Sequence, residues 1–182
     1  MTWDAFHRRG EVLRNVLDHA ETYRDGVLPM ELPGVAETFG DELTLMGALQ
    51  LRWHTRLAGA IERELMGQPM ELEAAVITAW RETATELAGL RAILDAYTDA
   101  PVSEEMARML DKAHRKDWTL MAAMAGKASP ADDRAAHVGR AIERKARVAY
   151  RPGAARPQPG SRRRAEADKP SLLRRVRAHL AA

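Results

Sequence analysis

The sequence predicts an all-α protein: an up-down antiparallel bundle of about five helices, followed by a disordered basic linker and a short C-terminal amphipathic helix. Large apolar residues recur at every fourth position through Asp41–Met66, which is the pattern of one long helix with an apolar side. The other apolar segments share this period without strand-like alternation, and the short connections between the later ones favour antiparallel neighbours. From Arg151 onward, Pro, Gly and Arg replace the apolar residues.

The first helix is expected from Trp3 to about Tyr23, with Thr2 as its N-cap. The connection that follows is rich in proline but also carries apolar residues, so we expect it to lie across the bundle, with one short helical turn near residues 35–39. An ordered connection of this length is uncommon, and a functional loop is the alternative interpretation.

The long helix at Asp41–Met66 organises the rest of the bundle, because its broad apolar stripe must be covered by other helices on two sides. We expect it to end at Gly67. The stripe consists of Leu45, Leu49, Trp53, Leu57, Ile61 and Leu65.

Three more helices complete the predicted body. The first spans residues 69–97, since proline is tolerated at the first helical position. The second spans residues 103–125, with Ser103 as N-cap and Gly126 as its stop. The third spans residues 129–150 and begins with an N-cap serine followed by proline. One tryptophan falls on each of the first four helices, and we interpret all four as core residues.

The predicted helices and the change of composition at Arg151 divide the chain into three segments. Residues 1–150 form the helical bundle domain, residues 151–170 a disordered linker rich in Pro, Gly and Arg, and residues 171–182 a basic amphipathic helix. The distribution of charge agrees with this division. Residues 1–128 contain 14 Lys and Arg against 21 Asp and Glu, whereas residues 129–182 contain 14 against five. An acidic body with a basic end can attract its own tail or offer it to an anionic partner.

Several classes of function are disfavoured by what the sequence lacks. There is no cysteine, which excludes disulfides and Cys-ligated metal sites. The phosphate-binding loop, the dinucleotide fingerprint, the nucleophile elbow and the His-Glu-x-x-His motif are all missing, so we predict no cofactor. The N-terminal segment has no apolar signal region, and no apolar run approaches the ~20 residues of a membrane span, so we expect a cytoplasmic protein. The excess of Arg over Lys and the abundance of Ala suggest a bacterial genome rich in G and C.

A polar site between the helices is the enzyme-like hypothesis. Asp117 occupies a core position, so it needs a donor or a charged partner, for which Arg56 and His54 are the available residues. The simplest interpretation is a buried pair that fixes helix register; a small-molecule pocket and plain surface exposure of Asp117 are the alternatives. The possible buried polar site comprises His54, Arg56, Thr83, His114 and Asp117.

A metal site is a second enzyme-like hypothesis, because helical bundles hold metals through inward carboxylates and Glu-x-x-His pairs. The nearest pattern is Asp111-x-x-His114-x-x-Asp117, and a Glu-x-x-His pair is missing. Asp111 and His114 have helical neighbours with which they can pair instead. We therefore assign no metal. Glycines inside the predicted helices, which are Gly10, Gly47, Gly59, Gly89 and Gly139, indicate either close helix crossings or a ligand that approaches the backbone.

The leading hypothesis is a non-enzymatic interaction or regulatory protein that binds an anionic or grooved protein partner through its basic tail. The partner-binding residues are Arg162, Arg163, Arg164, Leu172, Leu173, Arg174, Arg175, Val176, Arg177 and Leu180. Nucleic acid and an anionic membrane surface are the alternative partners of this tail, and a terminal helix that folds back on its own body is the structural alternative. The second hypothesis is a helical-bundle enzyme or a ligand or metal carrier that uses the polar site.

Overall fold

The computed structural model describes residues 3–148 and residue 150, with side chains from residue 7 onward. Every regular element in this part of the chain is helical, which confirms the all-α class. The helices are α1 (Trp3–Tyr23), α2 (Val35–Phe39), α3 (Glu42–Met66), α4 (Leu72–Glu86), α5 (Ala88–Asp99), α6 (Glu104–Met124) and α7 (Ala135–Val148). The linker and the amphipathic helix expected at residues 151–182 lie outside the described residues.

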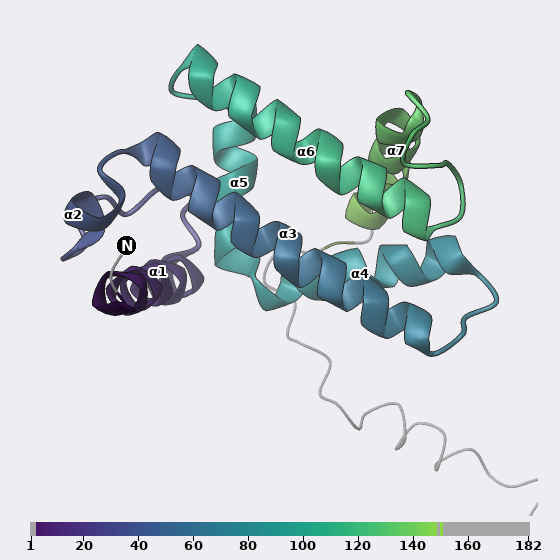
Figure 1. The fold of residues 1–182 in the computed structure, drawn as a ribbon, viewed down its shortest axis with the longest axis horizontal. Helices are drawn as coiled ribbons and strands as arrows, with labels where there is room; N and C mark the ends of the chain where they lie inside the picture. Colours follow the sequence, from purple (N-terminus) through teal and green to yellow (C-terminus); the bar gives the residue numbers. More distant parts are fainter. Residues whose placement is uncertain (1–2, 149, 151–182) are drawn as a thin grey trace, which may run out of the picture.

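The long helix α3 is the axis of the bundle. Figure 1 shows α4 running back alongside α3 and α6 on the other side of α3. It shows α1 almost along its own axis, so the axes of α1 and α3 are steeply inclined to each other. The helix α7 packs against α6 and α4, and α1 packs against α5. Trp53 and Trp80 meet edge to face across the α3–α4 contact, with ring centroids 5.9 Å apart. Both rings are buried, as expected of core tryptophans.

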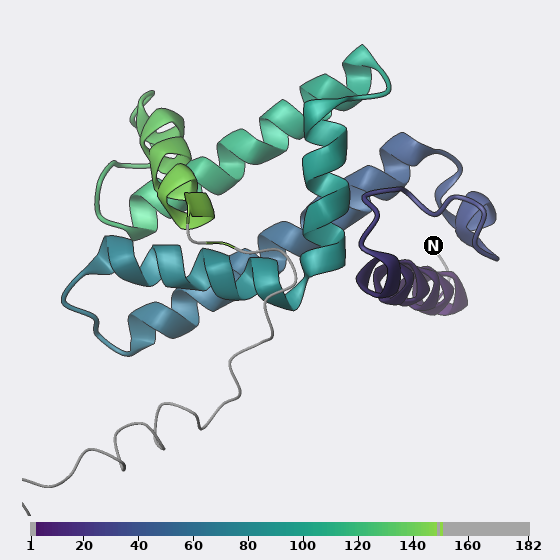
Figure 2. The same cartoon turned by 180° about the vertical axis from the view of Figure 1, so that it is seen from behind.

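The helix expected over residues 69–97 is two helices. The chain leaves helical geometry at Leu87, and α5 then turns away from α4, as Figure 2 shows from behind. The break frees the backbone N–H of Gly89, which donates to Glu21 Oε2 at 2.9 Å. It also brings Gly89 onto the backbone of α1: a Cβ atom there would lie 2.0 Å from the carbonyl oxygen of Ala20. Contact between α5 and α1 accompanies the bend, so Gly89 is one of the close helix crossings that helix glycines indicate, although the break at Leu87 was not expected.

Helix α7 begins at Ala135, six residues later than the serine expected to cap it. Ser129 and Asp132 are instead used in tight turns, where the Ser129 hydroxyl accepts the N–H of Ala131 at 3.3 Å and Asp132 Oδ1 accepts that of Arg134 at 2.8 Å. Helix α4 likewise begins at Leu72, after the proline expected to start it. In both places a residue that is compatible with a helix start is used in the preceding turn.

Ser103 caps α6 as predicted, by accepting the N–H of Met106 at 3.1 Å. Asp41, expected as the first residue of the long helix, is instead its N-cap and accepts the N–H of Thr44 at 2.7 Å. The expected cap Thr2 lies outside the described residues. Gly126 ends α6 with a positive φ of 66°, the usual geometry of a glycine after a helix. None of the helices in the described part of the chain combines the length and hydropathy that crossing a membrane requires.

Candidate functional site

The five residues expected to share one polar site are separated by the fold. His54 and Asp117 meet between α3 and α6. Arg56 forms an ion pair with Glu86, and the Thr83 hydroxyl donates to the carbonyl oxygen of its own helix at Ala79. His114 lies in a different pocket. Its side chain packs against Trp118, away from the pair.

Asp117 is only 5% exposed, and its partner is His54, one of the two residues expected. The imidazole Nδ1 lies 2.6 Å from Oδ1 of the carboxylate, and Gln50 donates its amide to Oδ2 at 3.3 Å. The hydrogen bond to Asp117 raises the pKa of His54 above its ordinary value, although partial burial opposes this. A buried carboxylate is thus tied to two positions of α3.

This arrangement orients an imidazole in the way that a general base is oriented, with one ring nitrogen held by a carboxylate. Catalysis by a nucleophile would need a hydroxyl or thiol beside the other nitrogen. The residues that line the surrounding cleft include no Ser, Thr, Tyr or Cys. The geometry therefore suits binding and proton exchange more than covalent chemistry.

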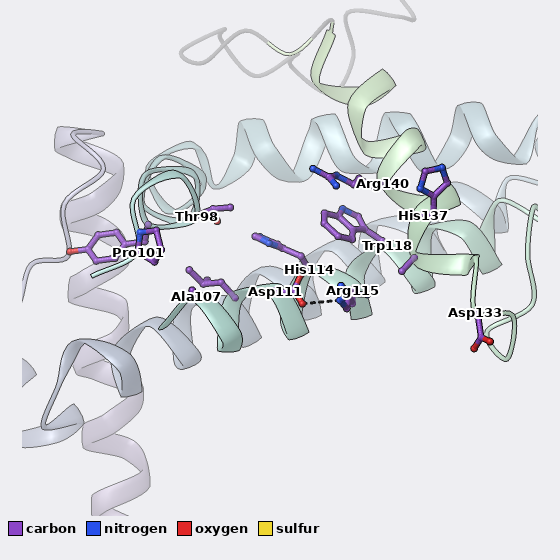
Figure 3. Close-up of a pocket in the computed structure, with 13 residues that line it drawn as sticks. Thr98, Pro101, Ala107, Asp111, His114, Arg115, Trp118, Asp133, His137 and Arg140 are labelled. Carbon is purple, nitrogen blue, oxygen red and sulfur yellow. Dashed lines mark hydrogen bonds and ion pairs between the residues drawn. The ribbon is translucent and has the colours of Figure 1, made fainter. Parts of the chain in front are cut away.

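His114 lies in a second and larger pocket, shown in Figure 3. A cavity of about 470 Å³ opens between the end of α5, the outer side of α6 and the first half of α7. The His114 ring stacks on Trp118 with centroids 5.6 Å apart and an angle of 26°. Burial, assisted by the positive charge of Arg91, lowers the pKa of His114 and so favours the neutral ring.

The sequence did not predict what holds Trp118 in place. Its indole N–H donates to Glu143 of α7, and Arg147 Nε donates to the other carboxylate oxygen at 2.8 Å. Arg147 also forks onto both oxygens of Asp95 in α5, at 2.8 and 3.2 Å. Trp118 is half-buried and joined to a polar network, which corrects its interpretation as a simple core residue.

Arg91 extends the network into the core. It is 2% exposed, its guanidinium lies 4.7 Å from the centre of the Trp53 ring, and it forms an ion pair with Asp95 at 2.8 Å. Burial raises the pKa of Asp95, but Arg91 and Arg147 together bring it below its ordinary value. The i, i+4 spacing of Arg91 with Asp95 and of Glu143 with Arg147 was visible in the sequence. The sequence did not show that the two pairs belong to one network.

The side chains of the Asp111-x-x-His114-x-x-Asp117 pattern do not converge on one site. Asp111 forms an ion pair with Arg115 at 2.8 Å, and Asp117 is engaged by His54. Within the described residues, no three His, Asp or Glu side chains lie close enough to hold a metal ion. The basic and apolar tail residues predicted to bind a partner lie beyond the described part of the chain.

Comparison of the chain with protein-family models, with curated proteins and with solved structures finds no match to any of the three.

Proposed function

We propose that the protein is a non-enzymatic interaction protein that recruits a protein partner through its basic C-terminal segment, residues 151–182. The division of charge carries the proposal. Residues 1–150 contain 19 Lys and Arg against 24 Asp and Glu, whereas residues 151–182 contain nine against two. A segment of this composition attracts acidic surfaces over a distance of about one Debye length, roughly 8 Å at physiological salt.

The described residues support this by giving the segment a fixed starting point. Arg147, in the last turn of α7, is held by Asp95 of α5. Tyr150 donates its hydroxyl hydrogen to the carbonyl oxygen of Ala84 at 3.1 Å, and its ring packs on Trp80. The last described residue is thus attached to α4, and the basic segment leaves a firmly packed body.

The test uses full-length tagged protein purified from its native cells, with the associated proteins identified by mass spectrometry. In one variant, Arg162, Arg163, Arg164, Arg174, Arg175 and Arg177 are all replaced by glutamine. The control replaces three exposed arginines of the body, Arg8, Arg14 and Arg108, in the same way. We expect the tail variant to lose specific partners that the control retains. An unchanged set of partners in the tail variant would show the proposal to be wrong.

Two direct measurements separate the other possible partners of the tail. Binding to a duplex DNA fragment, or to vesicles containing anionic lipid, is compared between the wild type and the tail variant at 50 and 200 mM salt. Phosphate contacts through several arginines predict a steep loss of affinity between these concentrations. Tail-dependent binding to DNA or vesicles, without a protein partner, would replace the proposal with the corresponding alternative.

A second candidate function is small-molecule carriage, and the pocket in Figure 3 favours it. Trp118 offers a ring fixed by Glu143, and the guanidinium of Arg140 lies 5.4 Å from the ring centre. Arg115 is already paired with Asp111, whereas Arg140 forms no ion pair within the described residues. A planar aromatic anion fits this combination, because its ring can stack while its charge meets the arginine.

The pocket is tested with 2-naphthoate and its uncharged amide, observed through the indole N–H resonance of Trp118. We expect 2-naphthoate to shift this resonance, and Arg140→Gln to weaken its binding at least fivefold. Arg134→Gln serves as the matched control, because Arg134 is exposed near the same end of α7. Equal binding of the acid and the amide, or no shift with either, would remove this candidate.

A further inference from the structure

The cleft between α3 and α6 is a site that neither candidate function uses. It has a volume of about 300 Å³, at the lower end of the range for small-ligand pockets. Each helix contributes one row with the spacing i, i+3, i+4, i+7, so the two rows face each other across the cleft. The rows are Gly47, Gln50, Leu51 and His54 of α3, and Met109, Lys112, Ala113 and Lys116 of α6, with Asp117 beside the second row.

The open space in the cleft depends on Gly47. A glycine inside a helix is less favourable than an alanine, so its presence at this position needs an explanation. At Gly89 and Gly139 the reason is a helix crossing, because a Cβ atom there would overlap a neighbouring backbone. At Gly47 a Cβ atom would meet nothing within 4 Å. Helix packing does not require this glycine, and a ligand that occupies the cleft would account for it.

The rim of the cleft is positively charged. Lys112 and Lys116 are exposed, and neither forms an ion pair within the described residues. His54 is held by Asp117, whose carboxylate offsets the charge of the protonated imidazole, so the net positive charge of the rim comes from Lys112 and Lys116. The only acidic residue that lines the cleft is Asp117, which His54 and Gln50 already engage. The rim of the cleft is therefore positively charged although the body as a whole is acidic, and a positive rim favours an anionic ligand.

The rest of the lining is mainly apolar. Leu51, which is 65% exposed, lines the cleft from α3, and Met109 lines it from α6. A ligand that covers Leu51 removes apolar surface from water, at about 25 cal/mol per Å².

One polar atom of the lining is also unsatisfied. Gln50 is 5% exposed and uses its amide N–H on Asp117, while its Oε1 atom has no hydrogen-bond partner among the described residues. Buried polar atoms nearly always have a partner, so this set of polar groups is incomplete. Oε1 is an acceptor and a carboxylate has no hydrogen to donate, so a water ordered beside the ligand would supply the missing donor.

We propose that the cleft between α3 and α6 binds a small amphiphilic carboxylate. Its anionic head lies among Lys112, Lys116 and His54, and its apolar chain covers Gly47 and Leu51 and reaches Met109. The charge selects an anion, the apolar floor selects a hydrocarbon chain, and the small volume selects a short one. This binding is independent of the basic tail and of the pocket beside Trp118.

Octanoate, kept below its micelle concentration, is the probe, and isothermal titration with the full-length protein is the measurement. We expect a Kd below about 1 mM, which is reasonable for a ligand with so few non-hydrogen atoms. We expect 1-octanol, which has the chain without the charge, and acetate, which has the charge without the chain, each to bind at least tenfold more weakly. Absence of octanoate binding, or equal binding of octanol, would overturn the proposal.

Two matched pairs of variants locate the site. Gly47→Leu fills the cleft and should weaken octanoate binding at least tenfold, whereas Gly10→Leu, at another helix glycine with open space around it, should leave binding unchanged. Lys112→Gln combined with Lys116→Gln should weaken binding at least fivefold, and the same change at Arg8 and Arg14 should not. Thermal unfolding of each variant confirms that it is folded.

The basic tail could bind octanoate by charge alone, so the titration is repeated with the tail variant described above. Retention of binding in that variant, together with its loss in Gly47→Leu, supports the cleft. Loss of binding in the tail variant, or full binding by Gly47→Leu, places octanoate elsewhere and overturns the proposal. Because the pull-down of partners is a separate measurement, failure of the cleft proposal and failure of the tail proposal are distinguishable.

Discussion

The two sides of α6 use the same kinds of residue for opposite purposes. Towards α7, Gly139 permits contact between helix backbones, and Glu143, Arg147 and Asp95 complete one another's charges. Towards α3, Gly47 leaves an open space, and the lysines on the rim of the cleft have no ionic partner in the described structure. The first side is closed by contacts between helices, whereas the second leaves an open cleft with a positively charged rim. The difference lies in what faces each residue, and it is not visible in the residue types.

The largest expected effect is at the α6–α7 crossing. In Gly139→Ala the new Cβ atom would lie 1.8 Å from the carbonyl oxygen of Trp118, so the helices must separate. We expect a loss of about 3 kcal/mol in the free energy of unfolding, measured with urea, because overpacking at a backbone contact cannot be relieved by a rotamer change. The control is Gly10→Ala, where the added methyl group meets nothing. A loss below about 1 kcal/mol at Gly139 would contradict the close crossing.

The second-largest expected loss of stability follows from breaking the ion-pair network of Arg147, Asp95 and Glu143. Arg147→Met keeps the hydrophobic stem but leaves Asp95 and Glu143 without their shared partner. We expect a loss of about 2 kcal/mol, which is less than for a fully buried pair, because Arg147 and Asp95 remain in contact with water. Lys112→Met, on the cleft side of α6, should change the free energy of unfolding by less than about 0.5 kcal/mol. Similar losses for the two variants would remove the distinction between the two sides.

The pH response should have opposite signs on the two sides. The pKa of His54 is raised in the folded protein, so its contribution to stability is complete below its ordinary value of 6.5 and is lost as pH rises through the folded value. The pKa of His114 is lowered, so the unfolded chain binds more protons, and stability is lost as pH falls below 6.5 through the folded value.

Titration of the two imidazole rings by NMR checks this prediction. Asp117 raises the pKa of His54, against the opposing effects of burial and of Lys116. Burial and the charge of Arg91 are the main causes of the lowered pKa of His114. We expect the midpoint of His54 to lie above 6.5 and that of His114 below it. His54→Gln should flatten the decrease in stability above pH 6.5, and midpoints in the reverse order would show this reading of the two sites to be wrong.

The smallest effect should be a gain in stability. Gly47→Ala adds a methyl group to the empty cleft and removes the conformational freedom of a helix glycine, so we expect stabilisation by about 0.5–1 kcal/mol. The measurement is the same urea titration as for Gly139→Ala, and the two results should differ in sign. Destabilisation at Gly47 would indicate a packing constraint that the open space does not show.

Individual residues show which features of the structure could be predicted from the sequence. The cap at Ser103 and the stop at Gly126 were predictable because each acts on atoms within a few residues of itself. The buried pair of Asp117 with His54 was also within reach, since a carboxylate at a core position demands a partner and few were available. The break at Leu87 could not be predicted, because it accompanies contacts between α5 and α1.

The sequence by itself determined that the chain is helical, where most helices begin and end, and that positive charge gathers in the last residues, because apolar periodicity, capping and charge are properties of neighbouring residues. Only the tertiary structure decided where helices break, which glycine is a crossing and which opens a cleft, and which of the scattered charged groups meet. Those outcomes depend on atoms far apart in the chain, such as those of Gly47 and Ala113, which line one cleft, or those of Arg147 and Asp95, which form an ion pair. Their approach is set by the packing of whole helices, which no local pattern specifies.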